Sequence, residues 1–127
     1  MDNLVMVPIS IGELYDKISI LEIKIGNMDS PGKIANVTKE YGLLRKIAED
    51  YPIDTELYKK IGQVNKRIWD IEDGIRECEK EKHFKERFKD LARAVYFNND
   101  LRSEIKKEIN LKYGSAIVEE KSYTNYK

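Results

Sequence analysis

The chain has 127 residues, and its 23 basic residues balance 23 acidic ones, so that its formal net charge is zero. This length fits a single domain over residues 1–127, and a neutral molecule gives no electrostatic reason to expect nucleic acid or a membrane surface as a partner. A single cysteine and a single histidine exclude an internal disulfide and zinc sites built from both residue types. We expect no metal and no other cofactor.

The sequence predicts neither export nor a membrane anchor. Residues 1–8 lack a basic region followed by a long apolar run, and no stretch reaches the length of a membrane span. Cys78 falls on the apolar side of a predicted helix, which indicates a buried thiol. We therefore expect a cytoplasmic protein.

The spacing of apolar residues predicts an all-α fold with helices over about 10–28, 31–50, 54–80 and 84–112. The first helix begins with Ser10 and Glu13 in the pattern of a capping box, in which each side chain satisfies a free backbone N–H of the other. Ser30 and Pro31 begin the second helix, since proline suits the first helical position.

The third predicted helix carries two stripes of side chains and the only tryptophan. Its apolar stripe consists of Leu57, Ile61, Val64, Ile68, Ile71, Ile75 and Cys78. A mixed stripe beside it consists of Tyr58, Gly62, Asn65, Trp69, Glu72 and Arg76. Because both repeat at alternating steps of three and four, each stripe keeps to one side of the helix. We therefore expect this helix to lie at the centre of the fold.

The fourth predicted helix has a polar interruption at 98–102, where Asn and Asp side chains compete with the helical backbone. The element is either two helices or one continuous helix with a polar middle. Gly114 suits the position after the last turn. The short segments 4–9 and 115–123 have the composition of extended chain, and they could pair with each other.

Short connections predict two long antiparallel helical hairpins that form a four-helix bundle. At 1.5 Å per residue, the second hairpin overhangs the first by roughly 10–15 Å. The overhang keeps apolar residues on its inner side, namely Ile71, Ile75, Cys78, Phe84, Phe88 and Leu91. Because a monomer seldom exposes so much apolar surface, we expect a homodimer.

In an antiparallel hairpin, residues at equal distances from the turn lie side by side. This level matching, applied to the second hairpin, predicts a layer of polar side chains inside the bundle. If the turn lies near residue 82, Asn65 is level with Asn99, and Gly62 is level with Arg102 and leaves room in the layer. The first helix rises from the same end as the third and brings Asp16 and Lys17 near this layer. The layer is either an ion-pair network that fixes the helix register or a site for a small anionic ligand.

Two catalytic interpretations are also open. Carboxylates three or four residues apart suit Mg²⁺, as in the all-α nucleotide pyrophosphohydrolases, and the candidates are Glu13 with Asp16 and Asp70 with Asp73 and Glu77. Chemistry of the chorismate mutase type needs cations that converge on a dianion, and the candidates are Lys17, Arg76, Arg93 and Arg102. Basic neighbours of several of these carboxylates indicate ordinary ion pairs instead.

Short motifs are distributed over nearly the whole chain, namely Val7-Pro8, Gly12-Glu13-Leu14, Asp16-Lys17-Ile18, Ile20 to Lys24, Asn65, Trp69 to Asp73, Ile75-Arg76, Leu91-Ala92-Arg93, Tyr96, Asn99-Asp100, Arg102, Gly114-Ser115 and Glu119 to Tyr123. In these motifs the chain resembles an uncharacterised family of small bacterial all-helical proteins, a domain of unknown function. The resemblance implies no activity, but it adds polar positions to the layer. The candidate ligand-binding residues are Asp16, Lys17, Asn65, Arg76, Arg93, Asn99, Asp100, Arg102, Lys121 and Tyr123.

These observations favour a binding or assembly module that acts as a homodimer. The alternative is a small enzyme or ligand-binding protein that holds an anionic metabolite at the Lys, Arg and Asn layer, and a magnesium-dependent nucleotide hydrolase is a third possibility. We expect the C-terminal segment with Lys121 and Tyr123 to fold over this layer. Full pairing of Lys17 and Arg102 inside the protein favours the first interpretation, and an open pocket around them favours the second.

Overall fold

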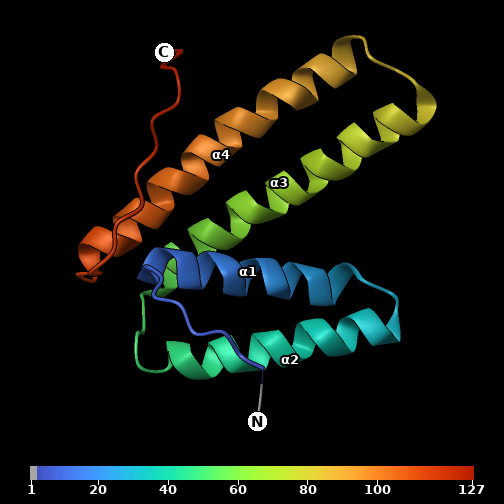
Figure 1. Ribbon diagram of the computed structural model, residues 1–127. Helices are drawn as coiled ribbons and strands as arrows, with labels where there is room; N and C mark the ends of the chain where they lie inside the picture. Colours follow the sequence, from blue (N-terminus) through green and yellow to red (C-terminus); the bar gives the residue numbers. More distant parts are fainter. Residues whose placement is uncertain (1–2) are drawn as a thin grey trace.

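The computed structural model describes residues 3–127, which contain four α-helices and no β-strand. The helices are α1 (Ile11–Asn27), α2 (Pro31–Ala48), α3 (Thr55–Glu81) and α4 (Glu86–Lys112). α1 and α2 form one antiparallel hairpin, and α3 and α4 form the other (Figure 1). The predicted all-α fold of four helices is confirmed, and each helix lies close to its predicted range.

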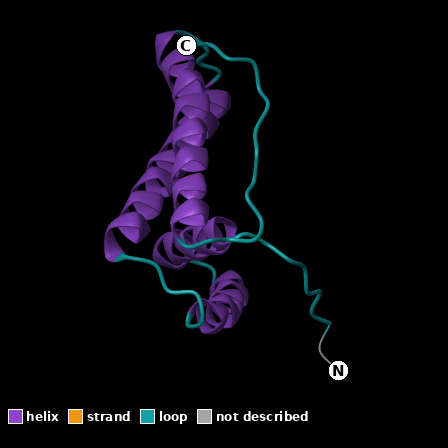
Figure 2. Ribbon diagram, turned by 90° about the vertical axis from the view of Figure 1, so that its left-hand side faces the viewer, coloured by secondary structure: helices purple, strands orange, loops and turns teal. Residues whose placement is uncertain are grey.

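The two hairpins cross steeply instead of lying parallel. In Figure 2, α3 and α4 run along the picture, while α1 and α2 are seen nearly end-on. α1 contacts each of the other three helices, whereas α2 contacts α1 alone. The centre of the fold is therefore α1, and the prediction that the helix of Trp69 lies there is wrong.

Apolar clusters lie on both sides of α1. One cluster joins α3 and α4 through Leu57, Ile61, Val64, Ile105 and Ile109. The other joins α1 and α2 through Leu14, Tyr15, Ile18 and Ala48. Ile11 and Ile53 pack against both clusters, so the two hairpins share one continuous core. Further along α3, the stripe residues Ile68, Ile71 and Ile75 are only half-buried.

The start of α1 follows the capping box in one half only. The Ser10 hydroxyl oxygen accepts a hydrogen bond from the Glu13 backbone N–H at 3.0 Å, as predicted. The Glu13 carboxylate does not return to Ser10 but accepts a hydrogen bond from the Lys106 ammonium of α4 at 2.6 Å. Serine alone suffices as an N-cap, so the glutamate is available to join α1 to α4.

α4 continues without a break through its polar middle. The Asn98 side-chain amide donates to the Ala94 carbonyl at 2.9 Å, so it is satisfied inside the helix instead of capping a new one. α4 ends in a left-handed turn at Gly114, where φ is 64°. There the Ser115 N–H donates to the Asn110 carbonyl at 2.8 Å, as in a Schellman motif. The prediction of Gly114 as the helix terminator is confirmed.

The two terminal segments are extended but do not pair with each other. The N-terminal segment leaves the start of α1 and points away from the helices, whereas the C-terminal segment runs back alongside α4 (Figures 1 and 2). No strand is formed in residues 3–127, so the suggested ribbon is absent from this range. Within the same range, no helix combines the length and the apolar character that crossing a membrane requires.

Candidate functional site

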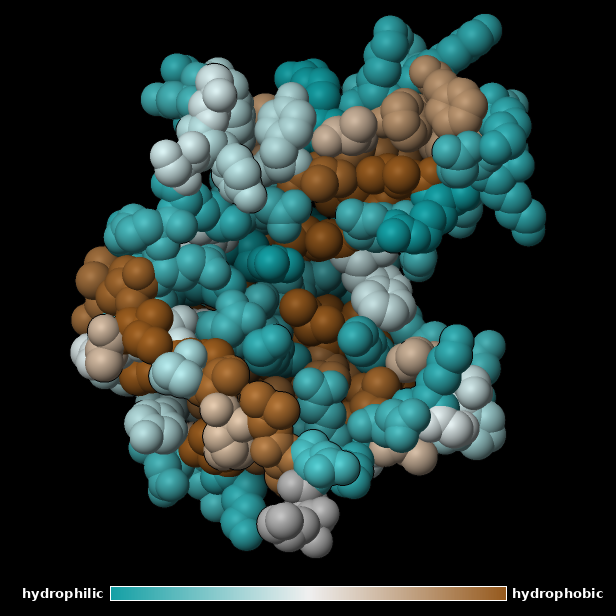
Figure 3. All heavy atoms as spheres, viewed as in Figure 1, coloured by the Kyte–Doolittle hydropathy of each residue, from teal (hydrophilic) through white to brown (hydrophobic). Residues whose placement is uncertain are grey.

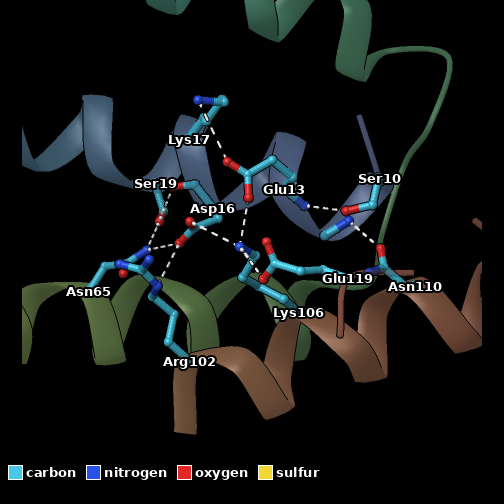
Figure 4. Close-up of polar contacts among 11 residues, drawn as sticks. Ser10, Glu13, Asp16, Lys17, Ser19, Asn65, Arg102, Lys106, Asn110 and Glu119 are labelled. Atoms are coloured by element: carbon cyan, nitrogen blue, oxygen red, sulfur yellow. Dashed lines mark hydrogen bonds and ion pairs between the residues drawn. The ribbon is translucent and has the colours of Figure 1, made fainter. Parts of the chain in front are cut away.

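Asp16 is the centre of a buried polar network that joins α1, α3 and α4. It is 3% exposed. The Asn65 side-chain amide donates to Asp16 Oδ1 at 2.9 Å and to Ser19 Oγ at 2.6 Å (Figure 4). Two cations approach the same carboxylate, Arg102 Nε at 3.7 Å and Lys106 Nζ at 3.7 Å. Level matching therefore brought Asp16, Asn65 and Arg102 together correctly.

Lys106 lies near three carboxylates of this network, although it is not among the site residues predicted from the sequence. The residue is 4% exposed. Its ammonium lies 2.6 Å from Glu13 Oε2 and 3.4 Å from Glu119 Oε1, in addition to Asp16 (Figure 4). It follows Arg102 by one helical turn, and this spacing was the signal that could have identified it.

The charges of Glu13 and Lys106 stabilise each other. Burial acts to raise the pKa of Glu13, but the hydrogen bond and the charge of Lys106 outweigh it and hold that pKa below its ordinary value of 4.5. Burial acts to lower the pKa of Lys106, but the hydrogen bond that its ammonium donates to Glu13 and the charge of Asp16 raise that pKa overall. Both groups are therefore ionised at neutral pH, as an internal ion pair requires.

Acidification is expected to remove part of this stabilisation. The pKa of Glu13 is lower in the folded chain than in the unfolded one, so the unfolded state binds more protons below about pH 4.5 and is stabilised relative to the folded state. The melting temperature should fall as the pH falls through this range. In Glu13→Gln the fall should be shallower, and circular dichroism melts between neutral and acidic pH measure both. Equal pH dependence of the melting temperature in the two proteins would show that the ion pair of Glu13 with Lys106 does not stabilise the fold.

Two side chains at and just after the end of α4 accept hydrogen bonds from the backbone at the start of α1. Asn110 Oδ1 accepts from the Gly12 N–H at 2.6 Å, and Ser115 Oγ accepts from the Ile11 N–H at 3.1 Å. Gly12 lies so close to α4 that a Cβ atom would sit 2.5 Å from the Lys106 carbonyl oxygen. Glycine is therefore required for this approach of the two helices.

An open cleft of about 450 Å³ adjoins the buried network between α1, α3 and α4. Its lining consists of Ile20, Ile23, Asn65, Ile68, Trp69, Glu72, Asp73, Arg76 and Arg102. Figure 3 shows the space-filling surface indented where the two hairpins diverge, at the right of the view. The mixed stripe of α3 thus faces this cleft from Asn65 onward instead of packing against another helix.

The inner end of the cleft contains polar atoms without protein partners. Asn65 is 3% exposed, and its Oδ1 accepts no hydrogen bond from the described residues. Its amide nitrogen faces Asp16 and Ser19, so the carbonyl lies on the opposite edge of the side chain. Within residues 3–127, Arg102 approaches Asp16 through Nε at 3.7 Å, and its guanidinium donates no hydrogen bond to these residues.

The outer end of the cleft is charged on both sides. Arg76 turns back along α3 to hydrogen-bond the Glu72 carboxylate and, at 3.2 Å, the Glu72 carbonyl. The Asp73 carboxylate next to them is exposed and has no ion-pair partner in residues 3–127. Trp69 lies between the two ends and forms no aromatic pair within the same residues.

Lys17 does not belong to the polar layer. Its side chain is 45% exposed and approaches one carboxylate among the described residues, Glu13 at 3.6 Å. Lys17 follows Asp16 directly, so its side chain projects from α1 about 100° away from that of Asp16. The prediction that both side chains point into the same layer is therefore wrong.

The other candidates lie away from the cleft. Asp100, Lys121 and Tyr123 line a separate hollow of about 600 Å³ between α4 and the C-terminal segment. The Arg93 guanidinium lies 5.8 Å from the centre of the Phe97 ring, and the half-buried Asn99 lines neither cavity. The C-terminal segment does reach the network, but it does so through Glu119 and not through Lys121 or Tyr123.

The carboxylates considered for magnesium are mostly engaged with basic side chains. Glu13 and Asp16 face Lys106, Asp70 pairs with Lys66 at 2.9 Å, and Glu77 pairs with Arg87 at 2.9 Å. Within the described part of the chain, no group of three or more metal-binding side chains is arranged to hold an ion. The four cations considered for a dianion do not converge either, since only Arg76 and Arg102 line the cleft.

Fold and site define an all-α protein in which a buried ion network adjoins an open cleft. The chain belongs to a family of unknown function (DUF6165), which matches residues 5–126. The resemblance found in the sequence motifs is thereby confirmed as a family relationship. No curated protein and no solved structure matches the chain.

Proposed function

We propose that the protein binds a small anionic ligand in the cleft between α1, α3 and α4. The observation that carries this proposal is the state of Arg102, which lines the cleft and donates no hydrogen bond within residues 3–127. A second arginine, Arg76, lines the outer end. Arginine offers five donors in a planar fork, so partial pairing with the protein leaves capacity for a ligand.

The buried network and the cleft have different roles in this proposal. Asp16, Glu13 and Lys106 satisfy one another inside the protein and serve as its scaffold. Arg102 lies 3.7 Å from Asp16, as Lys106 does, but its side chain is 28% exposed whereas that of Lys106 is 6% exposed. Arg102 therefore belongs to both regions, with one edge on the scaffold and the other toward the ligand.

Thermal melting against nucleotides, sugar phosphates and carboxylates tests this proposal. A ligand at one hundred times its dissociation constant adds about 2.7 kcal/mol to the free energy of unfolding, which is visible as a rise in melting temperature. Arg102→Gln should abolish the rise while the variant still melts cooperatively. Arg93→Gln is the matched control, because Arg93 is exposed outside the cleft, and it should keep the rise. The absence of any rise with the unaltered protein would refute the proposal.

A homodimer is a second proposal, favoured by the outer half of the α3–α4 hairpin. This half extends beyond α1 and α2 (Figure 1). Phe84 is 46% exposed there, and Phe88 and Leu91 are half-buried. A second copy packed against these residues would remove apolar surface from water, which is the main driving force of association. The outer half of the hairpin is thus the preferred interface.

Light scattering measures the mass of the protein in solution. We expect the mass of a dimer for the unaltered chain and the mass of a monomer for Phe84→Glu, because a carboxylate at the interface would lose its hydration. Phe84 is exposed in the single chain, so the substitution should leave the helical content unchanged. A monomer mass for the unaltered chain at micromolar concentration would exclude the dimer.

A further inference from the structure

The mixed stripe of α3 places different chemistry at successive turns of the cleft. Asn65 lies at the inner end, Trp69 one turn further, and Glu72 about two turns further. At 1.5 Å per residue, Asn65 and Glu72 are roughly 10 Å apart along the helix axis. Arg76 turns back to the level of Glu72. An occupant that uses all of these groups is therefore elongated, with different chemistry at its two ends.

The inner end favours a neutral polar edge over an anion. Asn65 Oδ1 is a buried acceptor that needs a donor, and the Arg102 guanidinium beside it is a donor that needs an acceptor. A phosphate at neutral pH offers acceptors and no strong donor, so it would leave Asn65 Oδ1 without a partner at this end. A ring edge that carries an N–H or amino group next to a carbonyl or ring nitrogen satisfies both groups without adding charge.

The middle of the cleft fits a flat ring. Trp69 is unstacked among the described residues, and the apolar side chains of Ile20, Ile23 and Ile68 line the space around it. Stacking of a nucleic acid base on an aromatic side chain contributes about 1–3 kcal/mol and does not depend strongly on the base. An apolar slot that is lined by an indole ring therefore suits a heterocyclic base.

The outer end combines acceptors with a cation. Carboxylates such as those of Glu72 and Asp73 bind sugar hydroxyls in nucleotide sites. Arg76 keeps free donors after it pairs with Glu72, and guanidinium groups bind phosphate through two parallel hydrogen bonds. A base at the inner end, a sugar beside the carboxylates and a phosphate beside Arg76 follow one another along the cleft in the order in which they are linked in a nucleotide.

We propose that the ligand of this cleft is a nucleoside monophosphate. Its base stacks on Trp69 with its polar edge on Asn65 and Arg102, its ribose hydroxyls face Glu72 and Asp73, and its phosphate binds Arg76. The inference rests on the proposed function, because it specifies the anionic ligand of the same cleft. The cleft volume of about 450 Å³ lies in the range of small-molecule sites.

Calorimetric titration of the full chain with matched probes tests the inference. The probes are uridine monophosphate and adenosine monophosphate. Ribose 5-phosphate serves as the probe without a base, and uridine and adenosine serve as the probes without a phosphate. One monophosphate at least should bind tenfold or more tightly than ribose 5-phosphate and its own nucleoside. Trp69 is the only tryptophan, so the same titration should change its fluorescence. Equal affinity for ribose 5-phosphate would overturn the nucleotide but leave the proposed function standing. No binding by any probe would also overturn the nucleotide, and the thermal melts with carboxylates would then decide the proposed function.

Substitutions at the two ends locate the base and the phosphate. Arg76→Gln should reduce the affinity for the monophosphate tenfold or more and leave the affinity for the nucleoside unchanged. Its side chain is 70% exposed, so the fold is not at risk. Asn65→Leu should reduce the affinity for the monophosphate and for the nucleoside alike. Gln63→Leu is its control, because Gln63 is an exposed amide on α3. If Asn65→Leu does not fold, Arg76→Gln decides alone, and an unchanged affinity for the monophosphate in that variant would overturn the proposal.

Discussion

Replacement of Lys106 by methionine is expected to lower the free energy of unfolding by about 3–5 kcal/mol, because removal of one partner of a buried ion pair leaves the other charge without compensation. The ammonium contacts Glu13 and Asp16, and the carboxylate of Asp16 is nearly inaccessible to water. Methionine fills a similar volume, so the loss in free energy of unfolding comes from the missing charge and not from a cavity. Urea unfolding followed by circular dichroism measures the change.

Lys107→Met is the matched control for this substitution. Lys107 is the next residue of α4, its side chain is 45% exposed, and it pairs with Glu120, which is 71% exposed. Exposed ion pairs contribute about 0–1 kcal/mol. A loss of similar size in both variants would show that Lys106 contributes no more than a surface pair, and the assignment of Lys106 as the scaffold cation would be wrong.

Gly12→Ala is expected to destabilise the protein by about 1–3 kcal/mol, the range for overpacking of a close contact. The new Cβ atom would lie 2.5 Å from the Lys106 carbonyl oxygen and 2.9 Å from Asn110 Oδ1, so α1 and α4 would have to separate. Separation would also stretch the hydrogen bond from the Gly12 N–H to Asn110. The change in the urea midpoint measures the effect.

Gly42→Ala makes the same chemical change, but we expect it to stabilise the protein. Gly42 lies inside α2, and nothing would be within 4 Å of its new Cβ atom. Alanine in an open helical position stabilises by up to about 1 kcal/mol relative to glycine. Two glycine substitutions with opposite signs would therefore establish that close packing, and not helix propensity, decides at Gly12. A stabilising effect at both positions would contradict the close approach of α1 and α4.

The helices were predictable because their apolar periodicity and capping residues are local features of the chain. The crossing of the hairpins was not, since it depends on which faces meet in space. The Asn65–Trp69 stripe has the same periodicity as a packing face, and sequence alone does not distinguish side chains that face another helix from side chains that face a cleft. For this reason α3 was predicted at the centre, where the structure has α1.

The polar network was partly predictable for a similar reason. Level matching in an antiparallel hairpin depends on chain geometry alone, and it brought Asn65 and Arg102 to Asp16. Lys106 was missed because lysine is usually a surface residue. Its position one turn after Arg102 showed that it shares the same face. Glu13 was assigned to a helix cap, and only the tertiary structure shows that it pairs with α4.

Urea unfolding of Arg102→Gln tests most directly whether the buried scaffold and the ligand site are separate parts of the protein. Asp16 keeps Asn65 and Lys106 as partners when Arg102 is replaced. We therefore expect the free energy of unfolding to stay within about 1 kcal/mol of the unaltered protein, as for a partly exposed ion pair. A loss as large as that of Lys106→Met would show that Arg102 is a structural residue and would contradict its assignment to the ligand.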